Sequence, residues 1–81
     1  MRKIQLSEYR EYMGTFIEVN NNHNHIVDNS IHIPYDNLLV NHKELLDKKK
    51  KYFIYCKGGI KSKKAVNILS YYGYDVTWVY K

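Results

Sequence analysis

The residues best suited to chemistry in this chain surround its single cysteine, Cys56. The cysteine follows an apolar run and precedes two glycines, Gly58 and Gly59, and then a segment with the composition of a helix. Such a loop can turn its backbone N–H groups inward as an anion-binding nest, because glycine readily adopts positive φ values. The start of the helix adds a partial positive charge. This arrangement favours a thiolate and predicts that Cys56 is a nucleophile.

Two lysines of the same loop, Lys57 and Lys61, add full positive charges near the thiol. A positive field attracts small anions and favours the thiolate further. The same loop would hold the oxyanion of a substrate such as thiosulfate. The alternative is that Cys56 is an inert buried thiol at the end of a strand, since free cysteine is often a small core residue.

Several other uses of a lone cysteine are disfavoured by its neighbours. Phosphatases with a Cys-x5-Arg loop need an arginine that binds a tetrahedral oxyanion, but Ser62 stands at that position and the loop contains no arginine. A Cys-x-x-Cys redox site would need a second cysteine. The histidines match no zinc pattern, so we expect no metal site from His23, His25, His32 and His42.

The composition indicates one small globular domain over residues 1–81, with no linker. The net charge is +5, but eleven of the thirteen basic residues are lysines, whereas nucleic-acid readers usually rely on arginine and exposed aromatic residues. We interpret the tyrosines and Trp78 as packing residues at the edge of the core. No membrane span or signal peptide is evident. We therefore expect a cytoplasmic monomer with no nucleic-acid or membrane partner.

The elements that must position the cysteine alternate between strands and helices. Gly73 is expected to end the helix that follows the cysteine loop. This alternation predicts an α/β fold, a small parallel sheet with helices on both faces, in which Cys56 lies at the carboxyl end of a strand, where sites form. Periodicity and capping residues predict a short helix over 7–12, strands over 15–19 and 30–33, a loop over 20–29, a helical segment over 36–46, a strand over 52–55, a helix from Ser62 and a strand over 76–80.

The segment Tyr55 to Ser62 resembles the active-site segment of rhodanese domains, which usually reads Tyr-Cys-x-x-Gly-x-Arg-Ser. The segment Thr15 to Asn20 resembles the family's first core strand, which usually ends in Asp-Val-Arg. Two further segments resemble the family in the same order along the chain. They are His25 to Pro34, similar to Gly-His-Ile-Pro-Gly-Ala-x-Asn-Ile-Pro, and Lys63 to Val76, similar to the family's helix and its Gly-Tyr-x-Val strand.

This resemblance implies a sulfurtransferase of the single-domain rhodanese type, in which Cys56 takes sulfane sulfur from a small sulfur-containing anion and becomes a persulfide. A thiol or a protein then accepts the sulfur, and no separate cofactor is needed. The resemblance assigns catalysis to Cys56. It assigns the binding of substrate and persulfide, by backbone N–H groups and the helix start, to Lys57, Gly58, Gly59, Ile60, Lys61 and Ser62.

The chain departs from the family pattern at three informative positions. Glu18 and Asn20 stand where aspartate and arginine are usual, and Lys61 replaces an arginine, which keeps the charge but loses the planar fork. The chain also stops soon after its last strand, where relatives usually continue. These departures support a second hypothesis, a rhodanese-like module that binds or regulates a partner without turnover.

Overall fold

The computed structural model describes residues 1–21 and 27–81, which form a five-stranded, entirely parallel sheet in the order β1-β5-β4-β2-β3. The predicted α/β fold with a small parallel sheet is confirmed, and the helices on its second face are two short 3₁₀ turns. The elements in chain order are β1 (Lys3–Gln5), the 3₁₀ turns η1 (Leu6–Glu8) and η2 (Glu11–Met13), β2 (Thr15–Glu18), β3 (Ile31–His32), α1 (Tyr35–Val40), α2 (His42–Leu45), β4 (Lys51–Tyr55), α3 (Ile60–Tyr71) and β5 (Asp75–Tyr80).

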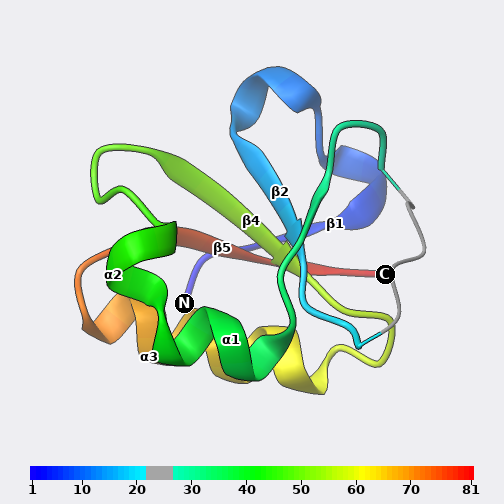
Figure 1. The fold of residues 1–81 in the computed structure, drawn as a ribbon. Coiled ribbons are helices and arrows are strands. Elements are labelled where there is room, and N and C mark those ends of the chain that lie inside the picture. The colour runs from blue at the N-terminus through cyan, green and yellow to red at the C-terminus, as the bar shows by residue number, and fades with distance from the viewer. Residues whose placement is uncertain (22–26) are drawn as a thin grey trace.

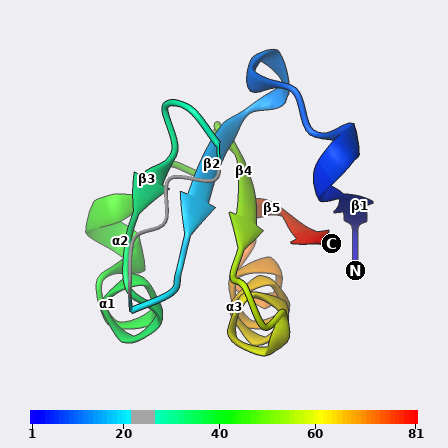
Figure 2. The same cartoon turned by 90° about the vertical axis from the view of Figure 1, so that its right-hand side faces the viewer.

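The sheet separates two apolar cores. The three α-helices lie together on one side of the sheet (Figure 1), and α1 and α3 run side by side there (Figure 2). Their apolar stripes meet one face of the strands. Periodicity predicts a stripe of Ala65, Val66, Ile68 and Leu69 in α3, and all of these except the exposed Ile68 are buried there. On the opposite face, the two 3₁₀ turns and the N-terminal segment cover a smaller cluster of aromatic and aliphatic residues, namely Tyr9, Phe16, Phe53, Tyr55 and Val79.

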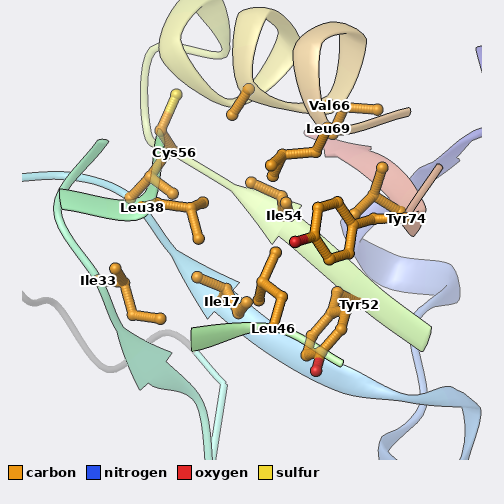
Figure 3. Close-up of a cluster of buried hydrophobic side chains, with 13 residues drawn as sticks. Ile17, Ile33, Leu38, Leu46, Tyr52, Ile54, Cys56, Val66, Leu69 and Tyr74 are labelled. Carbon is orange, nitrogen blue, oxygen red and sulfur yellow. The ribbon is translucent and has the colours of Figure 1, made fainter. Parts of the chain in front are cut away.

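Alternation along the strands explains why both faces are apolar. In β4, Tyr52 and Ile54 face the α-helices while Phe53 and Tyr55 face the smaller cluster, so the strand reads as a continuous apolar run. Because β4 lies between β2 and β5, its carboxyl end is in the middle of the sheet. The residue after Tyr55 is Cys56, which continues on the helical face at the edge of the larger core (Figure 3).

Three local expectations differ from the structure. The predicted helix over 7–12 is replaced by the two 3₁₀ turns, each only three residues long. The helical segment predicted over 36–46 begins one residue earlier, at Tyr35, directly after Pro34. Strand β1 was not predicted; it is short, lies at the edge of the sheet and pairs with β5, the last strand.

Candidate functional site

Cys56 lies at the carboxyl end of β4, where the chain leaves the sheet for α3. Its side chain is 4% exposed. Figure 3 shows it at the edge of the cluster that includes Leu38, Ile54 and Val66. A short turn follows, in which the N–H of Gly59 donates to the carbonyl of Cys56 over 3.2 Å. The thiol is therefore packed against the larger core on one side and lines a pocket formed by its loop and by Asn20 and Asn21 on the other.

The two glycines of the loop have different roles. Gly59 has a φ of +80° and is the N-cap of α3, so it needs the left-handed conformation that glycine adopts at little cost. Gly58 has no positive φ, and a Cβ atom there would meet nothing within 4 Å. The expectation that both glycines supply positive φ values is wrong for Gly58, because a single left-handed residue is enough to turn the chain into the helix.

Ser62 contacts the sulfur directly, although it does not begin the helix. The helix α3 begins at Ile60, two residues before the predicted start, which places Ser62 inside the first turn and fully buried. Its backbone N–H donates to Cys56 Sγ over 3.2 Å, and its Oγ lies 3.2 Å from the same sulfur. The N–H groups of a first helical turn have no partner within the helix. One of these groups here has the cysteine sulfur as its acceptor.

The loop lysines are not equivalent. The backbone N–H of Lys57 donates to the side-chain oxygen of Asn20, just after β2, over 2.9 Å, so this N–H does not belong to the anion nest. The side chain of Lys57 is exposed. Lys61, by contrast, lines the pocket that contains the cysteine. The structure thus favours Lys61 over Lys57 as the charge that an anion at the thiol would meet.

That pocket has a volume of about 270 Å³. A hollow of about 590 Å³ lies elsewhere, beside His42, Tyr72 and Tyr74, but no cysteine lines it. The smaller pocket matters more for this chemistry because the one thiol of the chain lines it. It is lined by Asn20, Asn21, Cys56, Gly58, Ile60 and Lys61.

The two residues that differ from the family pattern, Glu18 and Asn20, are hydrogen-bonded to each other and to the cysteine loop. Glu18 is fully buried, and its carboxylate accepts a hydrogen bond of 3.1 Å from the Asn20 amide. His32 contacts the Asn20 carbonyl through Nε2. A carboxylate–amide pair thus occupies the place where the family usually has a carboxylate and an arginine, and it also reaches the cysteine loop through Lys57.

Sequence reasoning missed Trp78 as a residue of this site. Its indole N–H donates to Ser62 Oγ over 3.0 Å, so Trp78 is linked to the cysteine sulfur through the Ser62 hydroxyl. The only available signal was its place in the strand next to the one that carries the cysteine. Among the described residues, no three His, Cys, Asp or Glu side chains gather as a metal site, and His23 and His25 fall outside the described residues. No described helix is long and apolar enough to cross a bilayer.

These features define an α/β domain whose central strand delivers a cysteine to a glycine-containing loop at the start of a helix. The profile of the Rhodanese-like domain family matches residues 4–81. The chain therefore belongs to the rhodanese-like domain family. The comparison with curated protein sequences gave no match.

Solved structures agree with this assignment. A rhodanese-related protein from Thermoplasma volcanium is 30% identical, with a TM-score of 0.86 over 99% of this chain and 84% of that one. A rhodanese-like domain protein from Staphylococcus aureus shares the fold at 24% identity, with a TM-score of 0.78 and coverage of 99% and 85%. The NAD-dependent persulfide reductase from A. fulgidus contains the same fold within a much larger chain, at 23% identity, a TM-score of 0.78 and coverage of 98% and 15%.

Proposed function

We propose that this domain is a sulfurtransferase that carries sulfane sulfur as a persulfide on Cys56. The observation that carries the proposal is the buried hydrogen bond from the Ser62 N–H to Cys56 Sγ, because Cys56 lines a pocket at the carboxyl end of the central strand. A donor aimed at sulfur stabilises negative charge there, and negative charge develops on the thiolate and on the persulfide alike. Rhodanese-like domains are generally associated with sulfur transfer, and one protein with this fold is a persulfide reductase.

The reaction balances without a cofactor. The Cys56 thiolate attacks the outer sulfur of thiosulfate, a new S–S bond forms to Sγ, and sulfite leaves with the electron pair of the broken S–S bond. A thiolate acceptor then attacks the outer sulfur of the Cys56 persulfide, and the cysteine thiolate leaves. After each step one negative charge remains on the persulfide or the thiolate of Cys56, beside the Ser62 N–H and at the pocket that the Lys61 side chain also lines.

The remaining loop residues, Gly58, Gly59 and Ile60, contribute to this chemistry by forming the turn and the wall of the pocket. Gly59 turns the chain so that the first turn of α3 begins directly above the thiol, and Gly58 and Ile60 line the pocket. The exposed Ile60 side chain stands at its rim, where a thiol or protein acceptor would approach. We further propose that residues 1–81 act as one domain and as a cytoplasmic monomer, without a nucleic-acid or membrane partner.

The test is sulfur uptake followed by mass spectrometry. The protein is incubated with thiosulfate or with an inorganic polysulfide, and the intact chain and its Cys56 peptide are weighed. We expect a mass gain of one sulfur atom on Cys56, reversed by cyanide or by a small thiol, and no gain in Cys56→Ser. A folded protein that gains no sulfur from either donor would refute the proposal.

A second candidate, a module that binds a partner without turnover, is favoured by one observation. The Cys56 side chain is only 4% exposed, and among the described residues Lys61 is the one cationic side chain that lines its pocket. This candidate predicts no sulfur uptake, together with capture of a cellular protein that survives Cys56→Ser. Sulfur uptake with multiple turnovers would exclude it.

A further inference from the structure

Trp78 lies on the same face of the sheet as the cysteine and beneath the start of α3. It occupies the middle of β5, where it pairs with Ile54 of β4 on one side and Lys3 of β1 on the other. Its backbone N–H donates to the carbonyl of Arg2, the residue before β1, over 2.9 Å, so the N-terminal segment helps to hold it in place. From this position the half-buried indole N–H reaches Ser62 Oγ at 3.0 Å.

The Ser62 hydroxyl has three polar neighbours. Besides the Trp78 N–H, its Oγ lies 3.2 Å from Cys56 Sγ and 3.2 Å from the carbonyl oxygen of Gly59. A hydroxyl offers one proton and two lone pairs, and an indole N–H can only donate. The indole N–H therefore occupies one lone pair of Ser62 Oγ. The single hydroxyl proton can be donated either to the Gly59 carbonyl or to Cys56 Sγ, but not to both.

The protonation state of the Cys56 sulfur determines which of these two acceptors receives the hydroxyl proton. When Cys56 is a thiol, its S–H can donate to Ser62 Oγ while the hydroxyl donates to the Gly59 carbonyl. When Cys56 is a thiolate or a persulfide anion, it only accepts, so the hydroxyl turns and donates to it. A hydroxyl that accepts a hydrogen bond from an indole N–H is a stronger donor, because linked hydrogen bonds polarise one another. Trp78 thus strengthens the hydrogen bond that Ser62 offers to the anionic sulfur.

The indole ring also packs against the loop. A Cβ atom on Gly59 would lie 3.7 Å from the ring atom Cζ2, and Lys63 Nζ lies 5.3 Å from the ring centroid. The tryptophan therefore contacts the N-cap and the first turn of α3, which are the segments that present N–H groups to the sulfur. Its two contributions, the N–H and the ring, can be separated by substitution.

We propose that Trp78 is a positioning residue that acts through Ser62 to stabilise the anionic sulfur of Cys56. The proposal rests on the proposed sulfur transfer for its biological meaning, but the hydrogen-bonded chain Trp78–Ser62–Cys56 is a property of the resting protein. It can therefore be measured without a sulfur donor, so that failure of sulfur transfer and failure of this inference give different results.

The experiment measures the rate at which iodoacetamide alkylates Cys56 at neutral pH, which reports the thiolate because the chain has no other cysteine. We expect Trp78→Phe, which keeps a ring but removes the N–H, to slow alkylation about two- to tenfold, the worth of one hydrogen bond. Ser62→Ala should slow it as well. The double variant should be no slower than Ser62→Ala, because residues that act in series are not additive.

Two further proteins keep the test decisive. Tyr80→Phe is the matched control, because the Tyr80 ring lies 5.3 Å from the Trp78 ring, and this change should leave the rate unaltered. If Trp78→Phe does not fold, a tryptophan analogue with sulfur in place of the indole N–H keeps the ring and should reproduce the slower rate. An unchanged rate with the analogue, or additive effects in the double variant, would overturn the proposal.

Discussion

The side-chain oxygen of Asn20 accepts a hydrogen bond of 2.9 Å from the backbone N–H of Lys57, across 37 positions of sequence. The register of the parallel sheet explains this contact. Glu18 of β2 pairs with Tyr55 of β4, so the residues two positions further along each strand, Asn20 and Lys57, emerge side by side at the carboxyl edge. Asn20 also donates to the buried Glu18 carboxylate, which ties the cysteine loop to the strand beside it.

Replacing Asn20 by alanine should loosen the cysteine loop. The variant loses the acceptor of the Lys57 N–H and the donor to Glu18, and we expect its free energy of unfolding to fall by about 1–2 kcal/mol. Sulfur uptake by Cys56 should slow as well. Urea unfolding and the rate of persulfide formation measure the two effects. Asn67→Ala on the exposed side of α3 is the matched control, and equal behaviour of the two variants would contradict the role of the Asn20 hydrogen bonds.

The two glycines of the loop should respond differently to substitution. Gly59→Ala places a side chain at a φ of +80°, which we expect to cost about 1–2 kcal/mol of stability, whereas Gly58→Ala meets open space at an ordinary φ. Thermal and urea unfolding of both variants test the difference. Equal destabilisation, or a larger loss for Gly58→Ala, would show that the turn does not depend on Gly59.

The two loop lysines should differ in how they affect an anionic donor. Lys61→Ala is expected to raise the KM for thiosulfate about two- to fivefold at low salt, because Lys61 lines the cysteine pocket. The effect should shrink at high salt as the charge is screened. Lys57→Ala should have the smaller effect, and Lys64→Ala on exposed α3 surface is the control. A larger effect at Lys57, or one independent of salt, would refute this assignment.

Two buried tyrosines should make the domain sensitive to alkali. Burial raises the pKa of Tyr55, with smaller contributions from the charges of Glu18 and Cys56, and burial followed by the charge of Glu11 raises the pKa of Tyr9. A phenol whose pKa is higher in the folded state contributes stability that is complete below its unfolded pKa of about 10 and is lost as the pH rises further. We therefore expect the free energy of unfolding to fall above about pH 10.

Urea unfolding at about pH 8 and about pH 10.5 tests this expectation. Tyr55→Phe should reduce the alkaline loss, and it should cost little at neutral pH because, within the described ranges, the buried Tyr55 hydroxyl has no hydrogen-bond partner. Tyr71→Phe, at a residue that is 88% exposed, is the control and should leave the alkaline loss unchanged. A Tyr55→Phe protein as sensitive to alkali as the wild type would contradict the role of this residue.

Short-range patterns in the sequence were enough to predict the fold class and the location of the cysteine. Three of these signals are the continuous apolar run of β4, the apolar stripe of α3 and the glycine before α3. They can be recognised in the sequence without knowing which segments pair in the fold. The predictions failed where local signals were weak. Strand β1 is three residues long and pairs with β5, and 3₁₀ turns over the smaller core replace the helix predicted over 7–12.

Some features around the thiol could likewise be predicted from local sequence, and others depend on the tertiary fold. That Cys56 ends a buried strand beside a left-handed glycine follows from residue types over a few positions, because turn chemistry is local. Which groups touch the sulfur and its loop depended on the packing of β2, β4, β5 and α3. Asn20 meets Lys57, and Trp78 meets Ser62, only because parallel register and helix docking bring separate segments to one edge of the sheet. No pattern along the chain carries that information, since these hydrogen bonds form between residues set side by side by the tertiary fold.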